Sequence, residues 1–317
     1  MRNLFLMCAM VLVFGAAASA VDFPTKEVRM IVPFAAGGGT DAVARTVAKL
    51  AEGELGKPIV IFNKTGGAGA VGMAEGAKSK ADGYTVTMVT RELSWLYQMG
   101  LAPVKPESFE PICLVNEDPA VMLVGKNSQY KTAGELVEAA RAKPGSLKFG
   151  STAKPNFYLL ALEVDQKVAF NQIPYGGAAE VIPAILGGHV DLTMMNPGEA
   201  FAQIKAGELI PLAVCSEERF AGLPDVPTMK ELGYNVVTGT WRGLAVPPKT
   251  PADVKAALTA AFEKAVKSEE FVKFMDDRRL GIRYIGGDDF MTFMTNDAKN
   301  LSGIVEAIKK AQAEEKK

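Results

Sequence analysis

The sequence has one histidine, three cysteines and two tryptophans, and its charges nearly cancel, with 35 basic and 36 acidic residues. A single histidine, His189, excludes a multi-histidine metal site, and a Ser-His-Asp hydrolase would have to use it. The G-x-S-x-G nucleophile elbow is also missing. Nucleic-acid binding proteins carry an excess of positive charge, which this chain lacks. We therefore expect no metal, no cofactor and no nucleic-acid partner.

The cysteines leave their redox state open. Cys8 lies in an apolar run near the N-terminus, whereas Cys113 and Cys215 lie in apolar, strand-like segments of the main chain. An exported protein can form a disulfide between the last two, but two buried free thiols are an equally good interpretation. Two cysteines are too few for a zinc knuckle.

The N-terminus has the pattern of a secretory signal. Arg2 precedes an apolar run over residues 4–18, and Ala18, Ser19 and Ala20 form a small-x-small cleavage site before Val21. We expect residues 1–20 to be removed and the mature protein to lie in the periplasm. No later apolar run is long enough to cross a bilayer, so a soluble product is expected.

A strand, a glycine loop and a helix follow one another over residues 28–55. The β-branched run at 28–34 predicts an interior parallel strand, glycines 37–39 predict a loop, and residues 41–55 show helical periodicity behind Thr40. Free amides and the dipole at the start of a helix favour a carboxylate or phosphate. A plain tight turn explains the same glycines.

A dinucleotide site is the third interpretation of this loop. Gly37, Gly39 and Ala42 fit the loose pattern G-x-G-x-x-[GA]. That fingerprint needs an acidic residue at the end of the next strand, where this chain has Asn63 and Lys64. An anion seat is therefore favoured over a dinucleotide site.

Strand-like and helix-like segments alternate along the rest of the chain, which predicts an α/β fold with mostly parallel sheets. The predicted helices include a short one over residues 229–232. Glycine-rich or polar loops recur after the predicted strands, and ligands of open α/β sheets bind at such carboxyl ends. We expect loops from two lobes to face each other across a cleft.

Six ordered segments resemble one known family. They are Phe23-Pro24-x-Lys26 leading into VRMIVPFAAGGGTDAVAR, ADGYTVTMV from Ala81, IPYGGAAEVIPAILGGHVDL from Ile173, IKAGELIPLAV from Ile204, LPDVPTMKELGY from Leu223, and TWRGLAVPPKTP from Thr240. In order and content they are similar to the periplasmic receptors of tripartite tricarboxylate transporters, also called Bug or TctC-like receptors. The resemblance covers nearly all of the mature chain.

The resemblance implies a type II periplasmic-binding-protein fold with two α/β lobes and two crossing segments. We expect the crossings near residues 118–123 and 238–241. Lobe one then comprises residues 21–120 plus 240–317, and lobe two comprises residues 121–239. A monomer would capture a small organic carboxylate between the lobes and deliver it to a membrane permease with a large and a small subunit.

The resemblance also implies a set of ligand-binding residues. In lobe one they lie at residues 34–40, and in lobe two at residues 150–156 and at two strand ends. The residues at the matching positions are Phe34, Ala35, Gly38, Gly39, Thr40, Ser151, Thr152, Asn156, Tyr175 and Asn196. Tyr175 and Asn196 could instead be satisfied structural polar groups.

Three departures from the family pattern add candidate charges. The loop at residues 150–156 lacks the family's glycines and serine, and Lys154 adds a possible cation there. Arg91 and Glu92 replace a small polar loop, so Arg91 could clamp a carboxylate. Glu92 could bind a ligand amine or pair with Arg91, and both could simply be surface residues. Arg242 follows Trp241 at the second crossing, where it could bind a distal anionic group or form an interlobe salt bridge.

These features predict a solute receptor that performs no chemistry. The cations Arg91, Lys154 and Arg242 favour a di- or tricarboxylate, while Glu92, Trp95 and Trp241 leave an amino acid or an aromatic acid open. Two alternatives remain. One is an exported α/β enzyme that uses a nucleotide at the loop of Gly37 and Gly39, and the other is a ligand sensor for a signalling partner.

Overall fold

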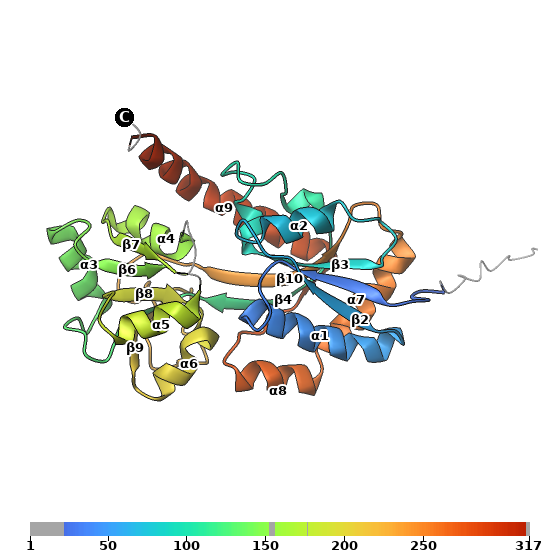
Figure 1. Ribbon diagram of the computed structural model, residues 1–317, viewed down its shortest axis with the longest axis horizontal. Helices are drawn as coiled ribbons and strands as arrows, with labels where there is room; N and C mark the ends of the chain where they lie inside the picture. Colours follow the sequence, from blue (N-terminus) through green and yellow to red (C-terminus); the bar gives the residue numbers. More distant parts are fainter. Residues whose placement is uncertain (1–21, 152–155, 176, 315–317) are drawn as a thin grey trace, which may run out of the picture.

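The computed structural model describes residues 22–151, 156–175 and 177–314. The predicted signal peptide, Thr152 and Lys154 lie outside these ranges. Two mixed α/β lobes lie side by side, and each is built on its own sheet (Figure 1). Of the helices in the described part of the chain, none is both long and apolar enough to span a membrane.

Lobe one is built on a six-stranded sheet with the order β11-β4-β10-β3-β1-β2. Its strands are β1 (Val28–Val32), β2 (Ile59–Asn63), β3 (Thr85–Thr90), β4 (Glu110–Pro119), β10 (Gly239–Val246) and β11 (Ile285–Gly286). Its helices are α1 (Gly39–Leu55), α2 (Ala70–Ala77), α7 (Ala252–Val266), α8 (Glu269–Asp277) and α9 (Gly287–Glu314), with two 3-10 turns, η1 (Arg91–Ser94) and η2 (Pro106–Ser108).

Lobe two is built on a five-stranded sheet with the order β7-β6-β8-β5-β9. Its strands are β5 (Val121–Gly125), β6 (Lys148–Ser151), β7 (Asn171–Pro174), β8 (Leu192–Met195) and β9 (Leu209–Val214). Its helices are α3 (Ala133–Ala142), α4 (Phe157–Gln166), α5 (Ala178–Leu186) and α6 (Pro197–Lys205).

The sequence pattern explains why β1 is an interior strand. Four of its five residues are apolar and fully buried, and it pairs in parallel with β2 on one side and β3 on the other. Apolar residues on both faces are typical of such a strand. Apolar residues of α1 and α7 pack against one face of the sheet, and those of α2 and α9 pack against the other face. The predicted interior parallel strand is confirmed.

The crossing strands make both sheets mixed. β10 pairs antiparallel with β3 and β4, and β5 pairs antiparallel with β8 and β9. Most strands of each sheet nevertheless share one direction, as the predicted fold class requires. The chain passes from β4 to β5 at Ala120 and returns to the first sheet at β10.

One predicted element is wrong: residues 229–232 form turns instead of a helix. Met229 donates its amide to the carbonyl of Val214, and Thr228 bridges Val214 in parallel. Gly233 follows with a positive φ of 86°. Four residues are too few to nucleate a helix when a neighbouring strand end competes for their backbone groups.

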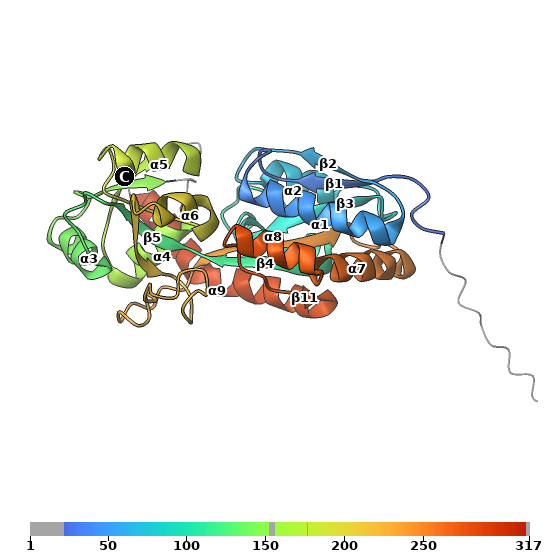
Figure 2. The ribbon, with the colours of Figure 1, turned by 90° about the horizontal axis from the view of Figure 1, so that it is seen from below.

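Helix α9 connects the two lobes. It packs against β4 and η1 of lobe one, and further along its length against α4 of lobe two (Figures 1 and 2). Leu301, Val305 and Ile308 of α9 are buried in the same cluster as Phe157 of α4. The lobes are thus joined by a packed helix as well as by the crossing strands.

The tight contact between β10 and α9 gives a stability prediction. A methyl group on Gly243 would overlap the ring of Phe290 and lie 2.8 Å from the carbonyl oxygen of Cys113. We expect Gly243→Ala to lower the free energy of unfolding by about 1–3 kcal/mol, because the neighbours are packed ring and backbone. Urea titration followed by circular dichroism measures this change.

Gly303 in α9 provides the matched control, because a methyl group there meets no atom within 4 Å. Gly303→Ala should leave stability unchanged or raise it by about 0.5–1 kcal/mol, since alanine favours helices. Equal stability of the two variants would contradict the packing described for β10.

Candidate functional site

The loop predicted to be an anion seat leads into the start of α1. The backbone amides of Gly39, Thr40 and Asp41 precede the first intrahelical bond, which joins the Ala42 amide to the Gly38 carbonyl. Within the described ranges, no group accepts a hydrogen bond from these three amides. The loop before them is exposed over residues 35–38, whereas Thr40 and Asp41 are buried, and the positive end of the helix dipole lies at this loop.

Asp41 holds the shape of this loop. Its Oδ2 accepts hydrogen bonds from the Gly37 amide and from Arg45 Nε, both at 2.9 Å, and its Oδ1 accepts from Asn63 Nδ2 at 2.9 Å. Asn63 also donates to the Phe34 carbonyl at 2.9 Å. Asn63, the residue that disfavoured a ribose site, thus ties the end of β2 to the glycine loop.

Arg242 lies directly beside the anion seat. Its Nε donates to Thr40 Oγ1 at 3.0 Å, and its Nη1 donates to Asp118 Oδ2 at 2.7 Å and to Asn116 Oδ1. A Cβ on Gly39 would lie 3.4 Å from Arg242 Nη2. No described residue accepts a hydrogen bond from Nη2, so this nitrogen can bind an anion seated at Gly39.

Arg91, in contrast, uses all three of its side-chain nitrogens on protein groups. Its Nε and Nη2 contact Asp297 at 3.4 and 3.2 Å, and its Nη1 donates to Thr238 Oγ1 and to the Gly239 carbonyl. All three nitrogens therefore bind protein groups near the second crossing. The structure places Arg91 as a link between η1, α9 and the start of β10.

Trp241 belongs to the same cluster. Its Nε1 donates to Asp297 Oδ2 at 2.9 Å, and its ring makes edge contacts with Phe290 and Phe293. Only 2% of the residue is exposed. Ser94 Oγ also donates to Asp297, at 2.8 Å. Asp297, which no sequence motif indicated, is the common acceptor.

The nearby Glu92 has no such partner. Its Oε2 and the Thr90 hydroxyl oxygen are buried and form no hydrogen bond with the described residues. Burial raises the pKa of the Glu92 carboxyl, while the Thr90 side chain, the Glu92 backbone and the charges of Arg242 and Arg91 act in the opposite direction. Thr90 lies directly opposite Arg242 in the β3–β10 pairing. Glu92 follows the carboxyl end of β3, so it lies at the end of the sheet beside the anion seat.

Lobe two presents polar groups opposite this end of the lobe-one sheet. Asn156 caps α4 by accepting hydrogen bonds from the amides of Tyr158 and Leu159, each at 3.1 Å. Tyr158 donates its hydroxyl to Asn196 Oδ1 at 2.9 Å, and the Asn196 amide donates to Glu199 at 3.0 Å. These contacts bring the starts of α4 and α6 together.

Charged residues of the two lobes affect each other's pKa values, so they lie close together. Burial raises the pKa of Tyr158, and the carboxyls of Glu92 and Glu199 raise it further. Burial also raises the pKa of Glu199, which Arg242 of lobe one opposes. Glu199 is nevertheless exposed to solvent. A group enclosed by both lobes and still in contact with water is what a cleft provides.

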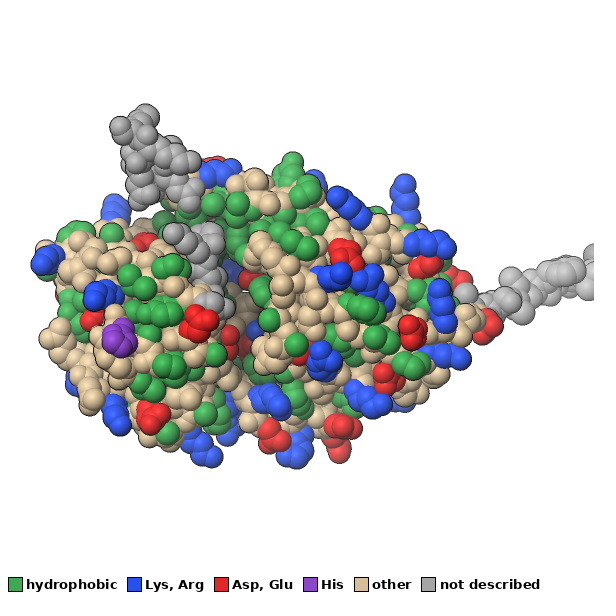
Figure 3. Space-filling view, viewed as in Figure 1, with side chains coloured by type: hydrophobic (Ala, Val, Ile, Leu, Met, Phe, Trp, Pro, Cys, Tyr) green, Lys and Arg blue, Asp and Glu red, His purple; other side chains and the backbone are tan. Residues whose placement is uncertain are grey.

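Figure 3 shows the surface hollowed between the lobes, with charged side chains visible inside. Of the other predicted site residues, Phe34 is half-buried and Ala35, Gly38 are exposed in the glycine loop, while Ser151 is buried at the end of β6. Tyr175 is half-buried, and its amide donates to the Ser151 carbonyl at 2.9 Å. The seat, Glu92 and the starts of α4 and α6 thus converge, whereas Arg91 and Trp241 are occupied by protein groups.

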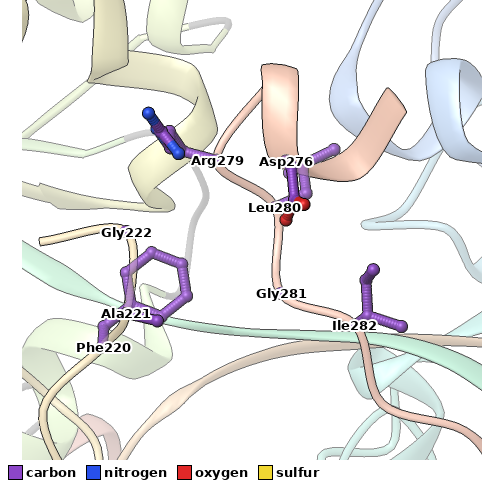
Figure 4. A pocket seen from close by; sticks show the side chains of 8 residues that line it. All are labelled: Phe220, Ala221, Gly222, Asp276, Arg279, Leu280, Gly281 and Ile282. Carbon is purple, nitrogen blue, oxygen red and sulfur yellow. The ribbon is translucent and has the colours of Figure 1, made fainter. Parts of the chain in front are cut away.

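The lobes also meet on the other side of the crossing strands. A cavity of about 200 Å³ lies between the loop of residues 220–222 and residues 276–282. Figure 4 shows the Phe220 ring of lobe two facing Arg279 and Leu280 of lobe one. This cavity does not include the glycine loop or any predicted site residue.

The single histidine and the two cysteines of the described chain lie away from the proposed seat. His189 is exposed on the surface of lobe two, where Figure 3 shows it apart from the hollow. No cluster of His, Cys, Asp and Glu among the described residues could hold a metal ion. Cys113 and Cys215 are free, buried thiols, and burial raises the pKa of Cys215 to about 12.

Comparisons with known proteins identify relatives of the whole chain. Residues 43–310 match the family model for the tripartite tricarboxylate transporter family receptor (TctC). The chain is similar to protein BugT of Bordetella pertussis, with 29% identity over 299 residues, covering 92% of each chain.

Two solved structures are similar in fold over their full lengths. A TctC solute-binding protein from Polaromonas has a TM-score of 0.76 and 33% identity, covering 90% of this chain and 99% of its own. An R. palustris protein solved with adipate has a TM-score of 0.80 and 26% identity, covering 90% and 98%. The predicted two-lobe periplasmic-binding-protein fold is confirmed.

Asp41 gives a pH-dependent prediction. Burial raises its pKa, but hydrogen bonds from Arg45, Gly37 and Asn63 outweigh burial and lower it overall. A lowered folded-state pKa stabilises the fold above the unfolded value of about 3.9, and this stabilisation is lost as pH falls through the folded value.

Asp41→Asn should therefore reduce the free energy of unfolding by about 1–2 kcal/mol at pH 7. The difference from wild type should stay constant down to about pH 4 and shrink below it. Urea titrations from pH 7 to pH 2.5 measure the profile. A difference that grows as pH falls would contradict the hydrogen bonding described for Asp41.

Asp297 gives a second prediction. Asp297→Ala removes the shared acceptor of Arg91, Ser94 and Trp241, so we expect a loss of about 2–4 kcal/mol in the free energy of unfolding. The control is Asp277→Ala, which breaks an exposed pair with Lys273 and should cost less than about 1 kcal/mol. A cost at Asp297 no larger than at Asp277 would show that Asp297 does not hold the cluster together.

Proposed function

Because the chain belongs to the tripartite tricarboxylate transporter receptor family, we propose that it is an extracytoplasmic receptor for a small organic carboxylate. Its relatives are solute-binding proteins, and one relative at 26% identity was solved with adipate. The observation that supports the proposal most is the anion seat at Gly39, Thr40 and Arg242. We propose that the receptor binds its ligand without chemistry.

The seat matches the chemistry of one carboxylate. The free amides of Gly39 and Thr40 and the unpaired Nη2 of Arg242 provide several donors within one small volume. Hydrogen bonds to an ionised carboxylate are stronger than neutral ones, and exclusion of water on lobe closure strengthens them further. Asn196 and Tyr158 of lobe two lie where they can complete the enclosure.

Family membership also supports a proposal for the remaining steps of transport. We propose that residues 1–20 are a signal peptide, that the mature protein acts in the periplasm as a monomer, and that it delivers its ligand to a permease with a large and a small subunit. The lobe boundaries proposed are residues 21–120 plus 240–317 and residues 121–239. A sensor that reports ligand binding to a signalling partner would use the same closure.

The structure weakens the prediction that Arg91 and Arg242 bind a second anionic group of the ligand. Arg91 is paired with Asp297, and Arg242 is paired with Asp118 beside the first carboxylate seat. A di- or tricarboxylate stays within the proposed ligand class, supported by the relative solved with adipate. Arg91 and Arg242 do not provide a separate site for the distal end of such a ligand.

The proposal is tested by filling the seat. Gly39 has ordinary backbone angles, but the branched side chain in Gly39→Val would occupy the space in front of Arg242 Nη2. We expect wild type to gain thermal stability with members of a carboxylate panel, by mass action on the folded state. Gly39→Val should weaken binding by roughly tenfold or more, measured by calorimetry, because several charge-assisted bonds are lost.

Gly53→Val is the matched control, because it lies in the same helix and its added carbon meets no atom within 4 Å. It should bind like wild type. Equal binding by both variants would place the ligand elsewhere. A nucleotide that binds wild type where no carboxylate does would support the alternative of a nucleotide-using enzyme.

A further inference from the structure

Glu92 is a carboxyl group with an unmet hydrogen-bonding capacity next to the anion seat. Its Oε2 is buried without a partner in the described structure, and so is the neighbouring Thr90 hydroxyl oxygen. An unpaired buried polar atom is costly, so such atoms point to a missing partner. The ionised carboxylate of Glu92 can only accept a hydrogen bond, so its missing partner is a donor, whereas the Thr90 hydroxyl can both donate and accept.

The protein's own cations do not supply this donor. Arg91, the adjacent residue, uses all three of its nitrogens on Asp297, Thr238 and Gly239. Arg242 directs two nitrogens to Thr40, Asn116 and Asp118. The arginines act on Glu92 through their charge, without a hydrogen bond.

Glu92 lies where a ligand would be enclosed. Thr90 is the cross-strand partner of Arg242, and Arg242 contacts the seat at Thr40. From the other side, Tyr158 of lobe two feels the charge of Glu92. The same segment of lobe one touches lobe two at Trp95, whose ring stacks on Phe157 with a centroid distance of 4.4 Å. Glu92 therefore faces the space between the seat and α4.

The local charge balance favours a ligand that brings positive charge. Three guanidinium groups lie around the seat, and each is paired with an aspartate: Arg45 with Asp41, Arg91 with Asp297, and Arg242 with Asp118. Glu92 and Glu199 add two further carboxyls. A zwitterion adds no net charge, and its ammonium, placed near these carboxyls, favours their ionised form, which burial disfavours.

We propose, on the basis of the function proposed above, that Glu92 determines specificity by binding an ammonium group next to the ligand's carboxylate. The ligand class is then the amino-substituted carboxylic acids. Its carboxylate binds at Gly39, Thr40 and Arg242, and its ammonium donates to Glu92 Oε2 and the Thr90 hydroxyl. A hydroxyl in the same place donates one uncharged hydrogen bond and is a weaker substitute.

Three matched series of acids test this inference. Each series keeps the carbon chain and changes one substituent: propionate, lactate and alanine; succinate, malate and aspartate; glutarate, 2-hydroxyglutarate and glutamate. Calorimetry at pH 7 measures the affinity of each acid for the full mature chain. In the series that fits the cleft, we expect the amino acid to bind roughly tenfold or more tightly than the unsubstituted acid, with the hydroxy acid between them.

Variants at Glu92 assign the preference to this residue. Glu92→Gln keeps the shape but removes the charge, so the preference for the amino acid should fall to within about twofold. Glu92→Asp keeps the charge and should retain part of the preference. The control is Glu107→Gln, an exposed residue 3.8 Å from Lys105, which should bind like wild type.

The outcomes separate this inference from the function on which it rests. If the unsubstituted acid binds wild type as tightly as its amino analogue, the receptor function stands and the role of Glu92 is wrong. The same conclusion follows if Glu92→Gln keeps the full preference. If no acid of any series binds wild type, the proposed carboxylate receptor is itself contradicted, and the inference fails with it.

Discussion

The buried guanidinium of Arg242 joins the parts of the molecule that must act together. It binds Thr40 at the start of α1, and Asn116 and Asp118 in the first crossing strand. Asp118 accepts a hydrogen bond from the amide of Gly281 at 2.7 Å. The preceding residue, Leu280, lies against Gly198 of lobe two. One charged group thus connects the anion seat to a contact between the lobes.

A buried charge is stable only when it is fully paired, and this requirement explains the neighbours of Arg242. Asp118 neutralises it and is itself fully buried. The remaining nitrogen, Nη2, borders Gly39, where a side chain would crowd it. A glycine at this position therefore keeps both the helix amides and the guanidinium accessible to a carboxylate. A second cluster of hydrogen bonds, at Asp297, fixes η1 and Trp241. Glu92 belongs to η1, so its backbone position is fixed as well.

Patterns in the sequence were sufficient for the fold and for the strand, loop and helix on which the proposed seat is built. The apolar run of β1, the three glycines and the periodicity of α1 predicted the strand, loop and helix that the structure contains. The ordered motifs predicted the family and its two-lobe fold. The failed prediction at residues 229–232 concerned a short segment whose backbone bonds depend on a distant strand, which local patterns do not encode.

The roles of the charged residues depended on partners far away in the sequence. Arg91 pairs with Asp297, 206 residues later, and Arg242 pairs with Asp118, 124 residues earlier. Nothing in the sequence around either arginine indicates its partner, so both arginines looked equally available for a ligand. Tyr158 and Glu199 follow the helix starts of Asn156 and Asn196, a position from which they could have been added to the site.

The most direct test is a crystal structure of the mature protein with a carboxylate that calorimetry shows to bind. The account predicts one carboxylate of the ligand within hydrogen-bonding distance of the Gly39 and Thr40 amides and Arg242 Nη2, with Tyr158 and Asn196 closing over it. A ligand bound instead in the cavity between residues 220–222 and 276–282, with the glycine loop in contact only with water, would contradict it.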